Sequence, residues 1–113
     1  AVVVLAAESA PRPAVTLAEV LATSDLPGGV VNILTGRAAE TAPWLASHAD
    51  VNAIDLTGVS DPVLATALEQ AAAGTLKRVV RPPAGPVDWT ADPGLGRLTA
   101  FLETKTVWHP KGL

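Results

Sequence analysis

The chain has 113 residues, of which 49% are hydrophobic and 17% are charged, and its formal net charge is −3. This size and composition describe one compact domain and exclude an intrinsically disordered tail. Cysteine is absent, which excludes a disulfide framework, a thiolate metal site and a thiol nucleophile.

The charged and apolar residues exclude two kinds of partner. Eight basic side chains are scattered along the chain, and only Lys77, Arg78 and Arg81 lie close together. Nucleic-acid binding needs a basic stripe that neutralises phosphates, so this scatter argues against it. Lys77 and Arg78 are expected on a solvated face, with pairing to carboxylates at the sheet edge as the alternative. The longest apolar runs have strand length and are too short to span a membrane. No signal or transit segment opens the chain, and we expect a cytoplasmic protein.

The N-terminus of the sequence indicates how the chain arose. The sequence contains no methionine and begins inside a predicted strand. We therefore expect that the chain was cut from a longer one, with a processed N-terminus as the alternative.

Strand and helix patterns alternate over residues 1–80. The expected strands are residues 1–6, 30–34, 51–56 and 76–80, and the expected helices are residues 15–23, 38–47 and 61–73. The first strand is a continuous apolar run, which is typical of a strand buried on both faces. This alternation predicts an α/β, Rossmann-like fold, in which right-handed crossovers place flanking helices on both sides of a parallel sheet.

Two of these helices carry expectations about their caps and inward faces. In the first, the spacing Thr16-x-x-Glu19 allows a capping box, with an earlier start of the helix as the alternative. In the third, Ser60 is the expected N-terminal cap. The expected inward-facing residues are Val15, Leu17, Val20 and Leu21 in the first helix and Val63, Leu64, Ala67, Leu68 and Ala71 in the third.

The pattern changes at Arg81. Residues 81–97 contain four prolines and three glycines without periodicity, which is typical of a connector. Residues 98–113 are the expected C-terminal arm, with a short helix over 97–103. A strand is expected from Thr104 to Trp108, because TKTVW alternates polar and apolar residues.

The segment from Leu26 to Gly58 reads LPGGVVNILTGRAAETAPWLASHADVNAIDLTG. It resembles the aldehyde dehydrogenases, in which a Leu-Pro-x-Gly-Val strand ending in Thr-Gly is followed at this spacing by a His-x-Asp-Val…Thr-Gly strand. The likeness covers residues 1–80 and resumes at 98–108. It implies a truncated, degenerate NAD-binding domain, similar to the pseudo-enzyme module of family 16 aldehyde dehydrogenases, in which the connector replaces the catalytic domain.

The resemblance also implies where a cofactor would be held. The family's Lys and Glu that hold the adenosine ribose of NAD fall on Leu5 and Glu8. Glu8 is therefore either a retained ligand or an exposed carboxylate at a strand end. Three family glycines give the cofactor close access to backbone, and here only Gly36 remains, because the other two positions are Ala38 and Ala42.

Further positions depart from the family pattern. Gly58 is kept, but Val59 replaces a serine that reaches a phosphate oxygen. The position of the general base is Pro82, which cannot abstract a proton. The family's cysteine nucleophile is absent, and its oxyanion-stabilising amide lies upstream of this segment. Trp44 is expected to pack rather than to stack on an adenine.

No catalytic residue and no metal ligand is expected, since His48 and His109 are too isolated in sequence for a metal site. The residual cofactor contacts would be Glu8, Gly36 and Gly58, so no cofactor is expected, or NAD if any.

The substitutions favour a non-catalytic protein with a structural or regulatory role. The resemblance assigns one strand to an oligomerisation arm that adds to a neighbouring subunit's sheet. Its residues are Thr104, Lys105, Thr106, Val107 and Trp108. A homo-oligomer, or a hetero-oligomer with an active aldehyde dehydrogenase, is therefore expected. The alternatives are a fragment of an NAD(P)-dependent aldehyde dehydrogenase, which is an oxidoreductase acting on aldehydes, and a residual nucleotide-binding module.

Overall fold

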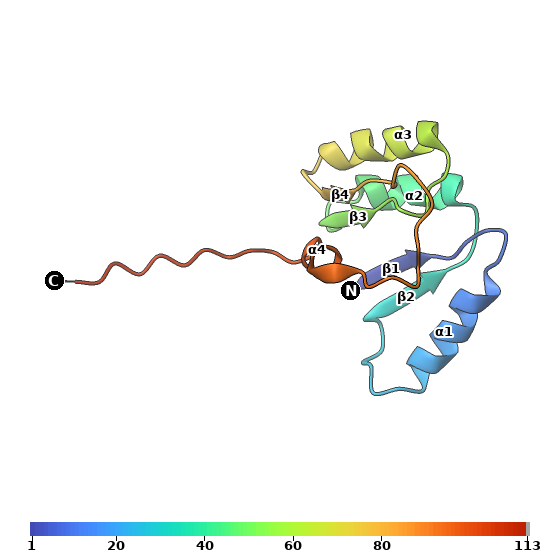
Figure 1. The fold of residues 1–113 in the computed structure, drawn as a ribbon, viewed down its shortest axis with the longest axis horizontal. Helices are drawn as coiled ribbons and strands as arrows, with labels where there is room; N and C mark the ends of the chain where they lie inside the picture. The colour runs from blue at the N-terminus through green and yellow to red at the C-terminus, as the bar shows by residue number, and fades with distance from the viewer. Residues whose placement is uncertain (113) are drawn as a thin grey trace. The chain divides into compact units, whose positions relative to one another are not determined.

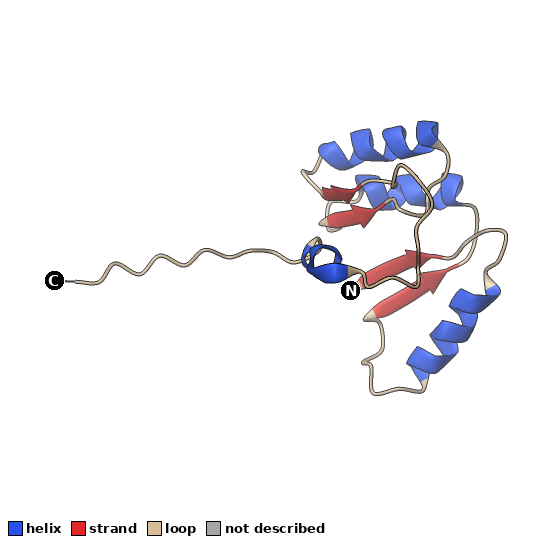
Figure 2. Ribbon diagram, viewed as in Figure 1, coloured by secondary structure: helices blue, strands red, loops and turns tan. Residues whose placement is uncertain are grey.

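The computed structural model describes residues 1–112 (Figure 1). The chain divides into two compact units, unit 1 from Ala1 to Pro82 and unit 2 from Pro83 to Leu113. In unit 1 strands and helices alternate along the chain, which confirms the predicted α/β class (Figure 2). Unit 2 contains one short helix within its described residues.

The elements of unit 1 follow the predicted order. Its strands are β1 (Val2–Leu5), β2 (Val31–Leu34), β3 (Ala53–Asp55) and β4 (Arg78–Val80), and its helices are α1 (Arg12–Ala22), α2 (Ala38–Ser47) and α3 (Pro62–Ala73). The bounds of α2 agree with the prediction at both ends. The last strand starts later than predicted, because Leu76 has a φ of +54° and turns the chain.

The strands form two parallel pairs. β1 pairs with β2 from Val2 opposite Val31 onward, and β3 pairs with β4 from Ala53 opposite Arg78 onward. The parallel direction agrees with the prediction, but the described strands form two two-stranded sheets rather than one. With only three residues each, β3 and β4 form short ladders, and no ladder joins them to β1.

The core of unit 1 lies between α2, α3 and the strands. Its buried cluster consists of Ala42, Ala46, Leu56 and Leu68. Small alanines on α2 let the helices approach closely, and α2 and α3 pack against each other in Figure 1. β1 contributes mainly Leu5 to this cluster, since the preceding valines are 38–53% exposed. The predicted burial of β1 on both faces is therefore wrong, because the described helices do not cover both faces.

Helix α1 begins one turn earlier than residue 15. Pro11 and Pro13 flank its start, where the missing amide hydrogen of proline costs little, so the capping box at Thr16 does not form. Among the predicted inward residues only Leu21 is half-buried. Val15, Leu17 and Val20 are 44–58% exposed, which corrects the predicted inward face. Ala14 and Ala18 are half-buried in their place.

Helix α3 is capped by Asp61 rather than by the predicted Ser60. Asp61 Oδ1 accepts a hydrogen bond from the Val63 amide at 2.9 Å. Of the predicted inward residues, Leu68 is buried and Leu64 and Ala71 are half-buried, as expected. Val63 and Ala67 are exposed, and the alanines at positions 65 and 72 are buried in their place.

Unit 2 contains α4 (Gly94–Thr99), which begins three residues before the predicted helix. Asp92 Oδ1 accepts from the Gly94 amide at 2.8 Å, and the guanidinium of Arg97 lies 5.5 Å from the ring centre of Trp89. The predicted strand from Thr104 to Trp108 is absent from the single chain, where this segment is exposed. A strand needs a hydrogen-bonded neighbour, and the described residues of unit 2 contain no other strand.

Candidate functional site

The candidate site is the region where β1 and β2 end and α2 begins. In open α/β sheets ligands bind beyond the carboxyl ends of the strands, where helix amide groups point outward. Glu8 lies in the turn after β1, and its Oε1 accepts a hydrogen bond from the Ala38 amide at 2.6 Å. The first amide of α2 is therefore engaged by a carboxylate of the chain itself.

The backbone of the turn before α2 requires a glycine. Gly36 has a φ of +146°, a conformation that L side chains rarely adopt. An added Cβ would meet only Thr41 Oγ1, at 3.9 Å, so backbone conformation rather than close approach explains the glycine. After the turn, Arg37 Nη1 and Glu40 Oε1 form an exposed ion pair at 3.3 Å. The predicted site glycine thus has a structural reason within this chain.

At the N-terminus of α3 the first amide donors are also engaged or missing. Asp61 Oδ1 accepts from the Val63 amide, and Pro62 has no amide hydrogen to offer. At the end of β3, Asp55 Oδ1 accepts a hydrogen bond from the Thr57 amide at 2.8 Å. Val59 packs against the buried cluster and supplies no donor. A Cβ on Gly58 would meet no atom within 4 Å, so close approach of a neighbour does not require a glycine at this position.

These contacts set the electrostatics at both helix starts. Carboxylates near a helix N-terminus are stabilised by the helix dipole and by amide hydrogens. Glu8 serves this role at α2, and Asp61 serves it at α3. A phosphate at either position would meet a negative charge and an amide that already has a partner. The arrangement therefore stabilises both helix starts.

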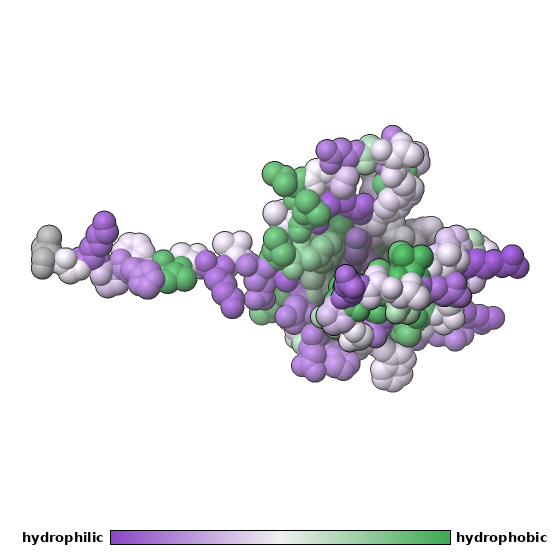
Figure 3. All heavy atoms as spheres, turned by 90° about the horizontal axis from the view of Figure 1, so that it is seen from below, coloured by the Kyte–Doolittle hydropathy of each residue, from purple (hydrophilic) through white to green (hydrophobic). Residues whose placement is uncertain are grey.

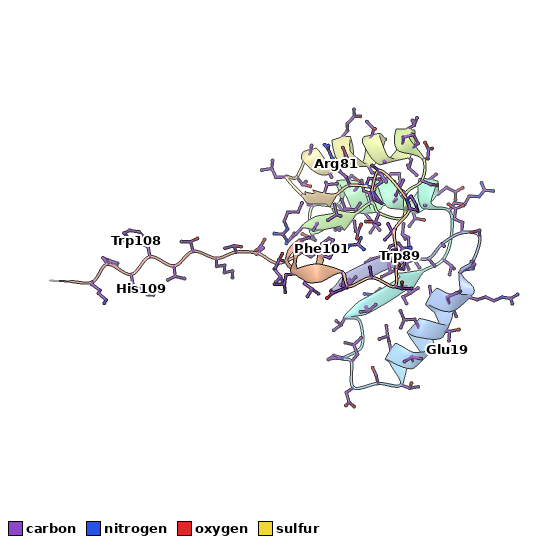
Figure 4. All side chains as sticks on the ribbon, in the orientation of Figure 1. Glu19, Arg81, Trp89, Phe101, Trp108 and His109 are labelled. Atoms are coloured by element: carbon purple, nitrogen blue, oxygen red, sulfur yellow. The ribbon has the colours of Figure 1, made fainter. Side chains whose placement is uncertain are left out.

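The other predicted residues lie apart from one another. Leu5 packs against the core cluster, and Pro82 is half-buried at the end of unit 1. Trp44 is 77% exposed on α2, so the expected packing role is wrong for the described chain, whose neighbouring elements leave this side chain uncovered. The five residues of the predicted oligomerisation strand are all exposed and without secondary structure. Figure 4 labels Trp108 and His109 on this extended segment.

Sequence reasoning missed one buried charged residue. Lys77 is 8% exposed, which corrects its expected solvated position. Its Nζ donates to the carbonyl of His48, at the end of α2, and to Thr75 Oγ1. A cation at a helix C-terminus is favourable, and this contact ties α2 to the start of β4. The isolated position of His48 in the sequence gave no signal for the pairing.

The described residues offer little else that could carry chemistry. Among them, no group of three His, Asp or Glu side chains is arranged to hold a metal ion. A shallow, mostly apolar hollow lies on the outer side of α3 and is lined by Pro62, Val63, Thr66, Ala67 and Gln70. None of these side chains ionises, so the hollow has no acid or base. Within residues 1–112 no helix has the length and apolarity needed to cross a bilayer.

Comparison with known proteins points to one family. The model of the aldehyde dehydrogenase family matches residues 1–83. The chain is 42% identical over 57 residues to 3-sulfolactaldehyde dehydrogenase from Priestia aryabhattai, which covers 50% of the chain and 12% of that relative. It is 40% identical over 72 residues to betaine aldehyde dehydrogenase from Rhizobium etli strain CIAT 652, with 64% and 14% covered.

A third relative is the mitochondrial aldehyde dehydrogenase of Leishmania tarentolae, 40% identical over 78 residues, with 69% of the chain and 16% of the relative covered. The chain thus spans 12–16% of the length of these relatives. No solved structure matched it.

Proposed function

The chain belongs to the aldehyde dehydrogenase family, and from this premise we propose that it is a non-catalytic member with a structural or regulatory role. It associates with itself or with an active aldehyde dehydrogenase, in the cytoplasm. The observation that carries the proposal is the hydrogen bond from the Ala38 amide to Glu8.

This contact supports a loss of cofactor binding. Glu8 falls on the position of a family ribose ligand, yet its carboxylate is turned to the start of α2. A cofactor would have to break this bond and also face an unfavourable charge. Leu5 packs in the core and cannot replace the second ribose ligand, a lysine in the family.

The start of α3 supports the same conclusion. Val59 stands where the family has a serine for a phosphate oxygen, and the carboxylate of Asp61 already caps the helix. Pro62 removes one further amide donor from this end. At each helix start one amide donor is therefore already engaged by a carboxylate of the chain itself.

Two further features support the absence of catalysis in this chain. The family's general base falls on Pro82, and a proline side chain has no group that can accept a proton. The chain also contains no cysteine for attack on an aldehyde. Point substitutions such as those at Val59 and Pro82 are not explained by the short length of the chain.

The association rests on the segment from Thr104 to Trp108. Val107 and Trp108 are 70% and 86% exposed, although large apolar side chains favour burial. The segment has a strand-type sequence and no strand partner among the described residues. Addition to the sheet of another subunit would provide both the ladder and the burial.

A fragment of an NAD(P)-dependent aldehyde dehydrogenase is the second candidate. The match over residues 1–83 and the short share of each relative favour it. In that case residues outside this chain would supply the nucleophile and the base. A residual nucleotide-binding module, with NAD contacts from Glu8, Gly36 and Gly58, is the third candidate.

Titration of the chain with NAD, followed by calorimetry, separates these candidates. We expect no heat of binding at micromolar cofactor, and we expect the chain to sediment as an oligomer or to co-purify with an intact aldehyde dehydrogenase. Micromolar affinity for NAD would overturn the non-catalytic proposal. A strict monomer that captures no aldehyde dehydrogenase would overturn the association.

A further inference from the structure

We draw no further inference here: the strongest candidate, the exposed apolar side chains of the β1–β2 sheet (Val2, Val3 and Leu34), which belong to the hydrophobic residues coloured green in Figure 3, supports no proposal because nothing among the described residues shows what covers them.

Discussion

The carboxylate of Glu8 accepts a hydrogen bond from the amide of Ala38 at 2.6 Å, across 30 positions of the sequence. The bond ties the turn after β1 to the start of α2. Glu8 stands at the position of a family cofactor ligand, and in this chain its carboxylate connects two elements of the fold.

Replacement of Glu8 is expected to lower the stability of unit 1. Glu8→Ala removes the capping carboxylate and should reduce the free energy of unfolding by about 1 kcal/mol, as measured by urea denaturation. Glu19→Ala, at an exposed position on α1, is the control and should change it by less than about 0.5 kcal/mol. Equal stability of Glu8→Ala and wild type would show that the contact contributes nothing.

The cap of α3 can be tested by a neighbouring pair of substitutions. Asp61→Ala removes the acceptor for the Val63 amide, so we expect a loss of about 1 kcal/mol in unfolding free energy. Ser60→Ala should have almost no effect, because Asp61 is the N-cap. Thermal unfolding of the two variants measures the difference, and a larger loss for Ser60→Ala would contradict the assignment.

The buried lysine offers a third test. Lys77→Met keeps most of the apolar stem but removes the donor to the His48 carbonyl and to Thr75 Oγ1. We expect a loss of about 1 kcal/mol, because the His48 carbonyl retains its bond from the Val51 amide. Lys111→Met, at an exposed position outside the proposed association strand, is the control for loss of a positive charge. Similar denaturation midpoints for the two variants would contradict a stabilising role for Lys77.

The turn at Asp88 responds to pH. The side-chain hydroxyl of Thr90 and then its amide donate to Asp88 Oδ1, at 2.6 and 2.9 Å, and they hold the pKa of Asp88 below its ordinary value of 3.8. Because the folded pKa is lowered, the turn is stabilised above the ordinary pKa and loses this stabilisation as the pH falls through the lowered value.

Thr90→Val removes the hydroxyl donor, and the pKa of Asp88 should rise toward 3.8. A titration of the Asp88 carboxyl by NMR measures the shift. Thr99→Val is the control, because its hydroxyl bonds to the Leu95 carbonyl and does not contact Asp88. An unchanged titration in Thr90→Val would show that the hydroxyl does not hold the carboxylate.

Part of the candidate site was predictable from sequence. Glu8 and Gly36 were identified by their places in a family pattern, and a glycine turn before α2 was expected at the observed position. The partner of Glu8 was not predicted, because 30 residues separate the two groups and only the folding of β1 beside β2 brings them together. The contact between Lys77 and His48, which are 29 positions apart, was not predicted for the same reason.

Local sequence patterns predicted the alternation of strands and helices, the parallel direction of the strands and both ends of α2. These features depend on periodicity and on turn residues, which act within a few positions of the chain. Three features became known from the folded chain: Asp61 caps α3, α1 exposes Leu17 and Val20, and the strands separate into two pairs. Burial and pairing depend on neighbours that are distant in sequence, so local patterns do not determine them.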